Sequence, residues 1–150
     1  MLEFEYLCDL RVDVGEIVTM GAGPLGERRI VAILGGTFEG PEMRGTVLPG
    51  GNDWQIVRTD GVVHLVARYT VETDSGGLIL VNTEGYRHGP PEVMARLARD
   101  ETVDPSLYYF RTFMRFETAD PAASWLNRIL AIGTGARQNK AVRIEVFEVL

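Results

Sequence analysis

Cysteine and histidine, the residues that most often build disulfides and metal sites, are scarce in this chain. Its one cysteine, Cys8, cannot form an internal disulfide, which is typical of a protein in the reducing cytosol. Because Cys8 falls in a strand-like run, we expect a buried packing thiol rather than a reactive one. Of the two histidines, His64 and His88, the second precedes a Gly-Pro-Pro segment and cannot share a regular helix face with Glu92. We therefore expect no metal site.

Basic charge and long apolar runs are also missing. The chain has 21 acidic residues against 15 Lys and Arg, a net charge of −6. This balance argues against nucleic acid as a partner, because phosphates require a basic surface. No segment approaches the roughly 18 apolar residues of a membrane helix, so we expect no membrane association. The first 14 residues carry acids where a signal peptide carries bases, which predicts a cytoplasmic protein.

Signatures of cofactor and covalent chemistry are absent or out of context. Residues 21–26, GAGPLG, match G-x-G-x-x-G, but no helix follows and Pro24 fits a surface loop. A dinucleotide site needs that helix, so we interpret the segment as a turn. There is no G-x-S-x-G elbow, no P-loop and no cysteine–histidine signature. The sequence therefore predicts no cofactor and indicates no particular reaction.

Turn-forming residues are abundant and define the fold. Between residues 35 and 61, short β-prone runs alternate with glycine, proline and Asn/Asp turn signals, as in antiparallel hairpins. The pattern predicts strands at 2–14, about 28–38, 43–48, 54–59, 62–73, 78–85, 107–118, about 128–133 and 141–149. Pro90-Pro91 predicts a short helix that follows it, and the Asp120-Pro121 cap predicts a second one over 122–126. We predict one all-β domain over 1–150: an antiparallel up-and-down β-barrel of eight to nine strands with two short helices.

The hairpin turns predict which side chains face the barrel interior, because side chains alternate strictly between the two faces of a strand. We assume a two-residue loop at Asp60-Gly61 and a loop over 74–77. The more apolar face is then taken as the inner one, and it comprises Trp54, Ile56, Arg58, Val63, Leu65, Ala67, Tyr69, Val71, Leu78, Leu80, Asn82 and Glu84. Its polar members must form a bridge between Arg58 and Glu84, or meet water or a ligand.

The segment 107–118 is aromatic on both faces. One stripe predicts core residues: Tyr108, Phe110, Thr112, Met114 and Phe116. The other stripe predicts an exposed or oligomer-facing surface: Tyr109, Arg111, Phe113, Arg115 and Glu117. Such a strand is seldom exposed to solvent on either face, so we expect a homodimer.

Five segments of the chain form long motifs: GERRIVAILGGTFEGPEMRGTVLPGGNDWQ, ARYTVETDSGG, GYRHGPPEV, VDPSLYYFRT and FETADPAASWLNR. Together they resemble domain-of-unknown-function family 3237, also known as uncharacterised protein family 0311, of bacteria and fungi. The similarity extends over residues 1–150. It implies a small β-barrel of lipocalin-like or calycin-like appearance and no established general activity. Val66 stands where the family often has aspartate, and Leu80 where tyrosine is common. If these positions line the family's pocket, the resemblance implies that the pocket of this chain is more apolar or binds a different ligand.

Our first functional hypothesis is a barrel that binds a partly apolar small molecule with a carboxylate or carbonyl group in its interior. Trp54 and Tyr69 would stack against this ligand, and Arg58 would hold a carboxylate or enolate oxygen. Asn82 and Glu84 would orient the ligand.

Two alternatives remain open. One is a cofactor-independent isomerase, cyclase or lyase acting on a carbonyl-containing metabolite, with Glu84 or Glu117 as the base and Arg58 or Arg111 as the oxyanion stabiliser. The other is a structural interaction module with a filled core. A cavity of roughly 300 Å³ or more with an unpaired carboxylate beside arginine would favour the enzyme, and a packed interior would favour the module.

Overall fold

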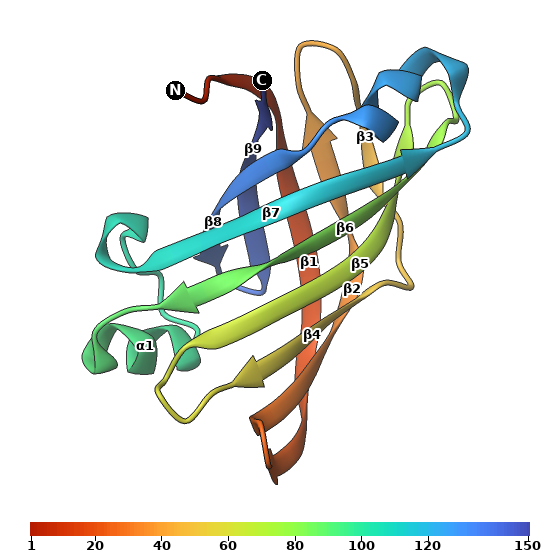
Figure 1. The fold of residues 1–150 in the computed structure, drawn as a ribbon. Coiled ribbons are helices and arrows are strands. Elements are labelled where there is room, and N and C mark those ends of the chain that lie inside the picture. Colours follow the sequence, from red (N-terminus) through yellow and green to blue (C-terminus); the bar gives the residue numbers. More distant parts are fainter.

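The computed structural model describes residues 1–150, which form an antiparallel β-barrel (Figure 1). The strands are β1 (Phe4–Gly23), β2 (Gly26–Glu39), β3 (Arg44–Val47), β4 (Asn52–Val57), β5 (Val63–Thr73), β6 (Leu78–His88), β7 (Tyr109–Thr118), β8 (Ala131–Gln138) and β9 (Ala141–Val149). The helices are α1 (Pro91–Ala98) and the 3₁₀ helices η1 (Pro105–Leu107) and η2 (Pro121–Arg128). None of these helices has the length and apolar character of a membrane-spanning segment.

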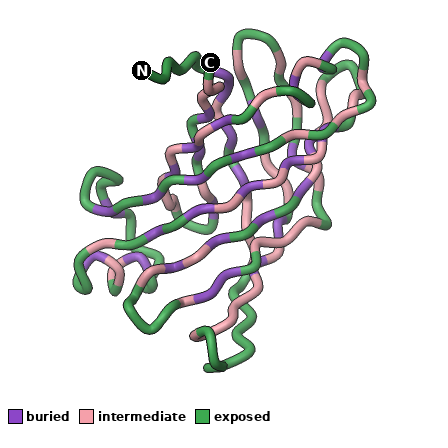
Figure 2. Tube along the Cα trace, in the orientation of Figure 1, coloured by how far each residue is buried: buried purple, intermediate pink, exposed green.

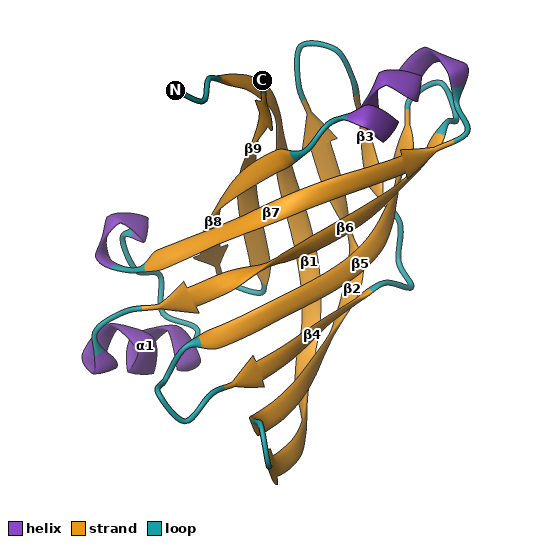
Figure 3. Ribbon diagram, viewed as in Figure 1, coloured by secondary structure: helices purple, strands orange, loops and turns teal.

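The sheet closes on itself because β1 pairs with both β2 and β9. From β5 to β9, each strand pairs with the next one along the chain. The short strands β3 and β4 both lie between β2 and β5, and each pairs with a different part of these two strands. Together they occupy one position, so the nine strands fill eight positions around the barrel. All pairings are antiparallel, which confirms the predicted all-β, up-and-down architecture with its short helices (Figure 3). Closure leaves no open sheet edge for another chain to pair with.

The first hairpin is longer than predicted. The first strand continues to Gly23, and the segment expected to be a loop at 21–26 is paired except for the two-residue turn at Pro24-Leu25. Gly21 and Gly26 have φ of 83° and 126°, values that side-chain-bearing residues rarely adopt. These glycines therefore allow a tight two-residue turn in place of the expected loop. The tip of the hairpin extends beyond the rest of the barrel (Figure 1).

The β4–β5 turn differs from the two-residue loop predicted at Asp60-Gly61. The Arg58 N–H donates to the Val62 carbonyl (2.9 Å), and the Gly61 N–H donates to the Arg58 carbonyl (3.0 Å). Gly61 has a φ of 88°, and the last paired residues before the turn are Val57 and Val63. A tight turn followed by a left-handed glycine is the glycine β-bulge, which adds one residue to the connection.

The β5–β6 turn repeats this geometry. The Thr73 N–H donates to the Gly77 carbonyl and the Gly76 N–H to the Thr73 carbonyl, both at 2.8 Å, and Gly76 has a φ of 91°. Glu72 therefore lies opposite Leu78. Each bulge shifts the register by one residue from the prediction, and a shift of one residue exchanges the two faces of a strand.

The prediction of the inner face is consequently confirmed on β5 and wrong on its neighbours β4 and β6. Along β5, alternate residues from Val63 to Val71 are buried, as predicted. Along β6 the buried residues are the odd-numbered ones from Ile79 to Arg87, so Asn82 and Glu84 face outward together with Leu78 and Leu80. On β4, Trp54 pairs with the outward-facing Val66, and Gln55 takes the inner position opposite Leu65.

Burial along β7 follows the predicted alternation. Tyr108 and the inner residues from Phe110 to Met114 are buried, and Phe116 is half-buried. The second stripe, from Tyr109 to Glu117, is exposed (Figure 2).

The two ends of the barrel are packed differently. At the η2 end, Leu126 lies in a dense core with Met114, Val146 and Cys8, which confirms the predicted buried thiol. Burial raises the pKa of the Cys8 thiol to about 12. At the other end, Leu97 of α1 packs in a smaller apolar cluster beneath the helix. The space between these two cores contains the candidate site.

Candidate functional site

A cavity of about 560 Å³ lies inside the barrel and extends to the α1 end. Its apolar wall includes Val31, Ile33, Leu65, Ala67, Val142 and Ile144. The volume falls within the usual range of small-molecule sites, roughly 300–1,000 Å³. A cavity of this size does not fit the hypothesis of a filled core.

Arg87 is the most unusual residue of the cavity. It occupies an inner position near the end of β6, is only 3% exposed, and its guanidinium lies 5.3 Å from the centre of the Phe110 ring. The Arg87 Nε is buried without a hydrogen-bond partner, and no carboxylate forms an ion pair with the side chain. Desolvation, with the nearby charge of Arg137, lowers the Arg87 pKa to about 10, so this buried cation remains charged at neutral pH.

A chain of hydrogen bonds joins three polar side chains of β2 and β4. The Arg29 Nη2 donates to the Gln55 Oε1, and the Gln55 Nε2 donates to the Asp53 Oδ2, both at 2.7 Å. The two strands pair with Arg29 opposite Gln55, which places these side chains next to each other. Gln55 is 5% exposed, so the backbone register and burial both fix the chain in position.

Asp53 ends this chain with one oxygen unpaired. The Oδ1 atom is buried and has no hydrogen-bond partner. Desolvation raises the pKa of the Asp53 carboxyl, against the opposing effects of the Gln55 hydrogen bond and the charges of Arg87 and Arg29. Although these cations are close enough to affect its pKa, Asp53 forms no ion pair with either.

The remaining unpaired polar atoms lie in the same place. The structure contains six buried side-chain nitrogen or oxygen atoms without a partner, and every one belongs to a residue that lines this cavity. They are the Arg29 Nε, Asp53 Oδ1, Tyr69 Oη, Thr83 Oγ1, Arg87 Nε and Thr112 Oγ1. Folded proteins pair nearly all of their buried polar groups, so this concentration makes the cavity the candidate functional site.

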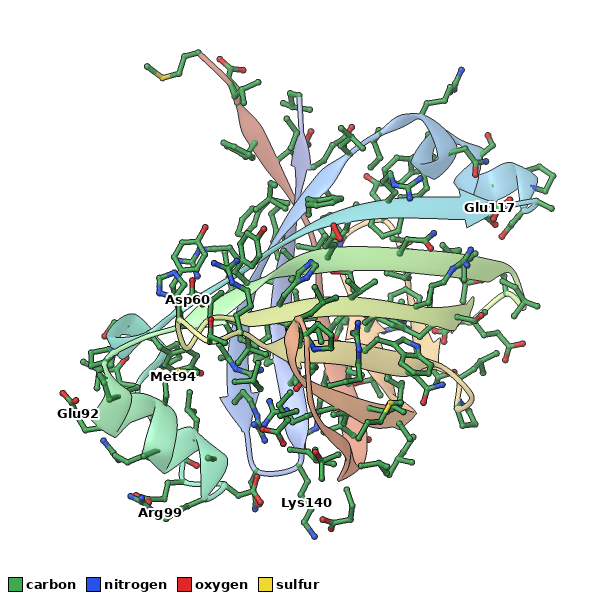
Figure 4. All side chains as sticks on the ribbon, turned by 60° about the horizontal axis from the view of Figure 1, so that its bottom comes forward. Asp60, Glu92, Met94, Arg99, Glu117 and Lys140 are labelled. Atoms are coloured by element: carbon green, nitrogen blue, oxygen red, sulfur yellow. The ribbon has the colours of Figure 1, made fainter.

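The cavity reaches the surface region around α1. Met94 of α1 and Lys140 at the β8–β9 turn border it (Figure 4). Asp100, two residues after the end of α1, also lines it. Two ion pairs lie here: the Arg137 Nη2 is 3.2 Å from the Asp100 Oδ1, and the Lys140 Nζ is 3.7 Å from the Glu16 Oε1. The charged groups of the entrance thus have partners of opposite charge, whereas Arg29, Asp53 and Arg87 deeper in the cavity form no ion pair.

Of the five predicted ligand-binding residues, only Tyr69 lines the cavity. Trp54 is 43% exposed on the outside of the barrel. Arg58 pairs with Asp60 in the β4–β5 turn, so the predicted bridge from Arg58 to Glu84 does not form. The register shift at Gly61 is the physical reason for both errors.

The other predicted site residues also lie outside. Asn82 and Glu84 face outward from β6, and the Glu84 Oε1 lies 3.4 Å from the His64 Nε2. Arg111 and Glu117 are exposed on the outer face of β7. The structure brings none of the four to the cavity, so the predicted bases and oxyanion stabilisers cannot act there. Val66 and Leu80 do not line the cavity either, so its polarity does not depend on them.

Fold and site together define a closed antiparallel β-barrel whose internal cavity has a largely apolar wall and several buried polar groups. The sequence profile of the protein family of unknown function DUF3237 matches residues 2–149, and the chain belongs to this family. A UPF0311 protein of Rhodopseudomonas palustris is 42% identical over 99% of this chain and 97% of its own. These findings confirm the resemblance noted in the sequence.

Solved structures show the same fold. The R. palustris conserved protein of unknown function has a TM-score of 0.94 at 41% identity, covering 100% of this chain and 98% of its own. A β-barrel-like protein of Acinetobacter baumannii has a TM-score of 0.88 at 41% identity, covering 100% and 97%. A protein of unknown function from Clostridium acetobutylicum has a TM-score of 0.89 at 32% identity, covering 100% of both chains.

Proposed function

We propose that this protein binds a small organic anion with an apolar body inside its barrel. The observation that carries the proposal is Arg87, a buried cation with neither an ion pair nor a hydrogen bond from its Nε atom. Burying an uncompensated charge destabilises a folded protein, and such groups persist where they serve a ligand. A carboxylate or enolate oxygen is the natural partner of a guanidinium.

The charges around the cavity favour an anion over a cation. Arg29, Arg87 and Arg137 all line it, and Arg137 already pairs with Asp100 at the entrance. Asp53 is the one carboxylate of the cavity that forms no ion pair, and its Oδ1 atom is buried without a hydrogen bond. Two guanidiniums thus lack a carboxylate of their own, and an anionic ligand would restore the balance.

The remaining surface of the cavity suits an apolar ligand body with a few polar substituents. Valine, leucine and isoleucine side chains form much of the wall. The hydroxyls of Tyr69, Thr83 and Thr112 are buried without partners and could hydrogen-bond a ketone or hydroxyl group. Tyr69 would thus contact the ligand through its hydroxyl, in place of the ring stacking predicted from the sequence.

We also propose self-association through the outer barrel wall. An outer row of three aromatic side chains and one isoleucine, here called the aromatic row, runs across β7, β8, β9 and β1 and comprises Phe113, Ile132, Phe147 and Tyr6. In the adjacent row, Arg111 lies on β7 and Glu145 on β9. A second copy related by a two-fold axis would bring β7 of one chain to β9 of the other, so opposite charges would meet around the aromatic row.

The single thiol fits the further proposal that the protein is cytoplasmic. Cys8 lies in the packed core, and no disulfide is required to hold the barrel closed.

The binding proposal is tested by calorimetric titration with 4-oxo-4-phenylbutanoate, which combines a phenyl ring, a ketone and a carboxylate. The matched neutral probe is 4-oxo-4-phenylbutanamide. We expect the acid to bind at least tenfold more tightly than the amide, which corresponds to about 1.4 kcal/mol. Arg87→Met should remove this preference, whereas Arg115→Met on the exposed face of β7 should preserve it. Equal binding of both probes, or a preference unaffected by Arg87→Met, would contradict the proposal.

A further inference from the structure

Asp53 differs from the other two carboxylates that line the cavity. Glu16 and Asp100 lie at the entrance and pair with Lys140 and Arg137. Asp53 lies deeper, on the inner face of β4, and pairs with no cation. Burial without a cationic partner is costly for a carboxylate that serves only stability.

The side chain of Asp53 is held by one oxygen and free at the other. Gln55 donates to Oδ2 and is itself held by Arg29, so the carboxylate has a fixed orientation. The Oδ1 atom has no protein partner. A general base needs this arrangement: one oxygen anchored by its surroundings and one available for the proton.

Asp53 and Arg87 share the cavity without forming an ion pair. Two opposite charges retained only for stability gain by direct contact, because each is costly when buried alone. Their separation leaves space for ligand atoms between a base and a cation. Catalytic sites separate a base in this way from the cation that holds the anionic group of the substrate.

We infer that Asp53 is a general base and acid that transfers a proton on an enolisable keto acid bound in the cavity, so that the protein is a cofactor-independent isomerase. This inference rests on the proposed binding function. It supplies a catalytic carboxylate in place of Glu84 and Glu117, which lie outside the barrel.

The proton transfer needs no other reactant. The Asp53 Oδ1 takes a proton from the carbon next to the ketone, and the C–H electron pair becomes the C=C bond of an enolate. The carbonyl π electrons move to oxygen, where a buried donor such as the Arg29 Nε or the Tyr69 hydroxyl stabilises the charge. Return of the proton from Asp53 to the same carbon regenerates the substrate and allows hydrogen exchange, whereas its return to the opposite face of that carbon, or to the far end of an enolate conjugated with a C=C bond, completes an isomerisation and regenerates the carboxylate. Burial raises the pKa of Asp53, which strengthens it as a base in its ionised form.

The inference is tested by following deuterium incorporation next to the ketone of 4-oxo-4-phenylbutanoate in D₂O by proton NMR. We expect the protein to accelerate exchange at least about a hundredfold over buffer, the lower bound for general acid–base catalysis. The rate should rise with pH as Asp53 ionises and then become constant. Asp53→Asn should abolish the acceleration, and its affinity for the acid should be unchanged or higher because a negative charge is removed. Asp74→Asn, in the exposed β5–β6 turn, is the matched control and should exchange like the wild type.

The outcomes separate the two proposals. If the acid binds but exchange is not accelerated, or if Asp53→Asn exchanges as fast as the wild type, the catalytic inference is overturned and the binding function stands. If the acid does not bind, both fail. Circular dichroism and melting curves establish that Asp53→Asn is folded. Should it not fold, Gln55→Leu replaces it, because loss of the anchor should lower the exchange rate by at least tenfold with little change in affinity.

Discussion

Replacing Arg87 with methionine should stabilise the ligand-free protein. Burial lowers the Arg87 pKa from 12.5 to about 10, and this difference corresponds to about 3 kcal/mol against the charged form in the folded state. Methionine removes that penalty while retaining much of the side-chain length. It also removes the contact between the guanidinium and the Phe110 ring, which is worth about 1–2 kcal/mol when desolvated. The net expectation at pH 7 is a gain of about 1–2 kcal/mol.

The effect has a defined pH dependence. Because the folded pKa of Arg87 is depressed, the penalty is fully present at pH 7 and disappears as the pH rises through about 10 toward the unfolded value. The stability difference between Arg87→Met and the wild type should therefore shrink above about pH 10.

Urea denaturation and calorimetry of ligand-free samples measure this gain, which for a chain of this size corresponds to a melting temperature higher by about 4 °C. Arg115→Met, at an exposed position of β7, controls for the loss of one positive charge and should change stability by less than about 0.5 kcal/mol. A loss of more than about 1 kcal/mol in Arg87→Met would show that Arg87 has a structural partner, and the argument for a ligand would fail.

Three further predictions concern the rest of the molecule. Gly61→Val should destabilise the protein by about 1–3 kcal/mol in denaturant titrations, because Gly61 has a φ of 88° that valine rarely adopts. No atom lies within 4 Å of the added Cβ, so backbone strain is the main cost. Unchanged stability would refute the bulged turn. Cys8 should not react with a thiol reagent at pH 8 until the protein unfolds, since burial raises its pKa to about 12; rapid labelling of the native protein would contradict this. Light scattering should give a dimer that Phe113→Lys converts to a monomer of 16.6 kDa, and a monomeric wild type at micromolar concentration would exclude the proposed interface.

The sequence was sufficient to predict the barrel because turn chemistry and apolar alternation agree along most of the chain. The β7 stripe from Tyr108 to Phe116 and the inner residues of β5 were placed correctly, since only one face of each follows the buried pattern. Family membership was also visible in the long motifs and is confirmed by the profile match over 2–149.

The site could not be predicted with the same success. Two glycine bulges, at Gly61 and Gly76, change the register by one residue each, and the segment Leu78 to Val81 is apolar on both faces. Hydrophobic pattern alone therefore cannot choose between the two faces of β6.

Four polar cavity residues were missed for related reasons. Arg87 was not assigned because β6 was expected to end at Gly85, two residues before it. Arg29, Asp53 and Gln55 become a unit only when β2 and β4 pair, a contact between segments that no local motif reveals. The glycines at 61 and 76 were the signal in the sequence that could have corrected the register, because a glycine at the end of a tight turn is typical of a bulged hairpin.

The Arg87 Nε–H group offers the most direct test of the central claim, because it is buried and has no partner within the protein. Its nitrogen and proton NMR signals can be assigned by their loss in Arg87→Lys and followed while 4-oxo-4-phenylbutanoate is added. Binding of the carboxylate in the cavity predicts that this signal shifts to saturation and exchanges more slowly with water, while the signal of the exposed Arg115 does not move. A shift confined to exposed arginines, with Arg87 unchanged at saturating probe, would contradict an anion site inside the barrel.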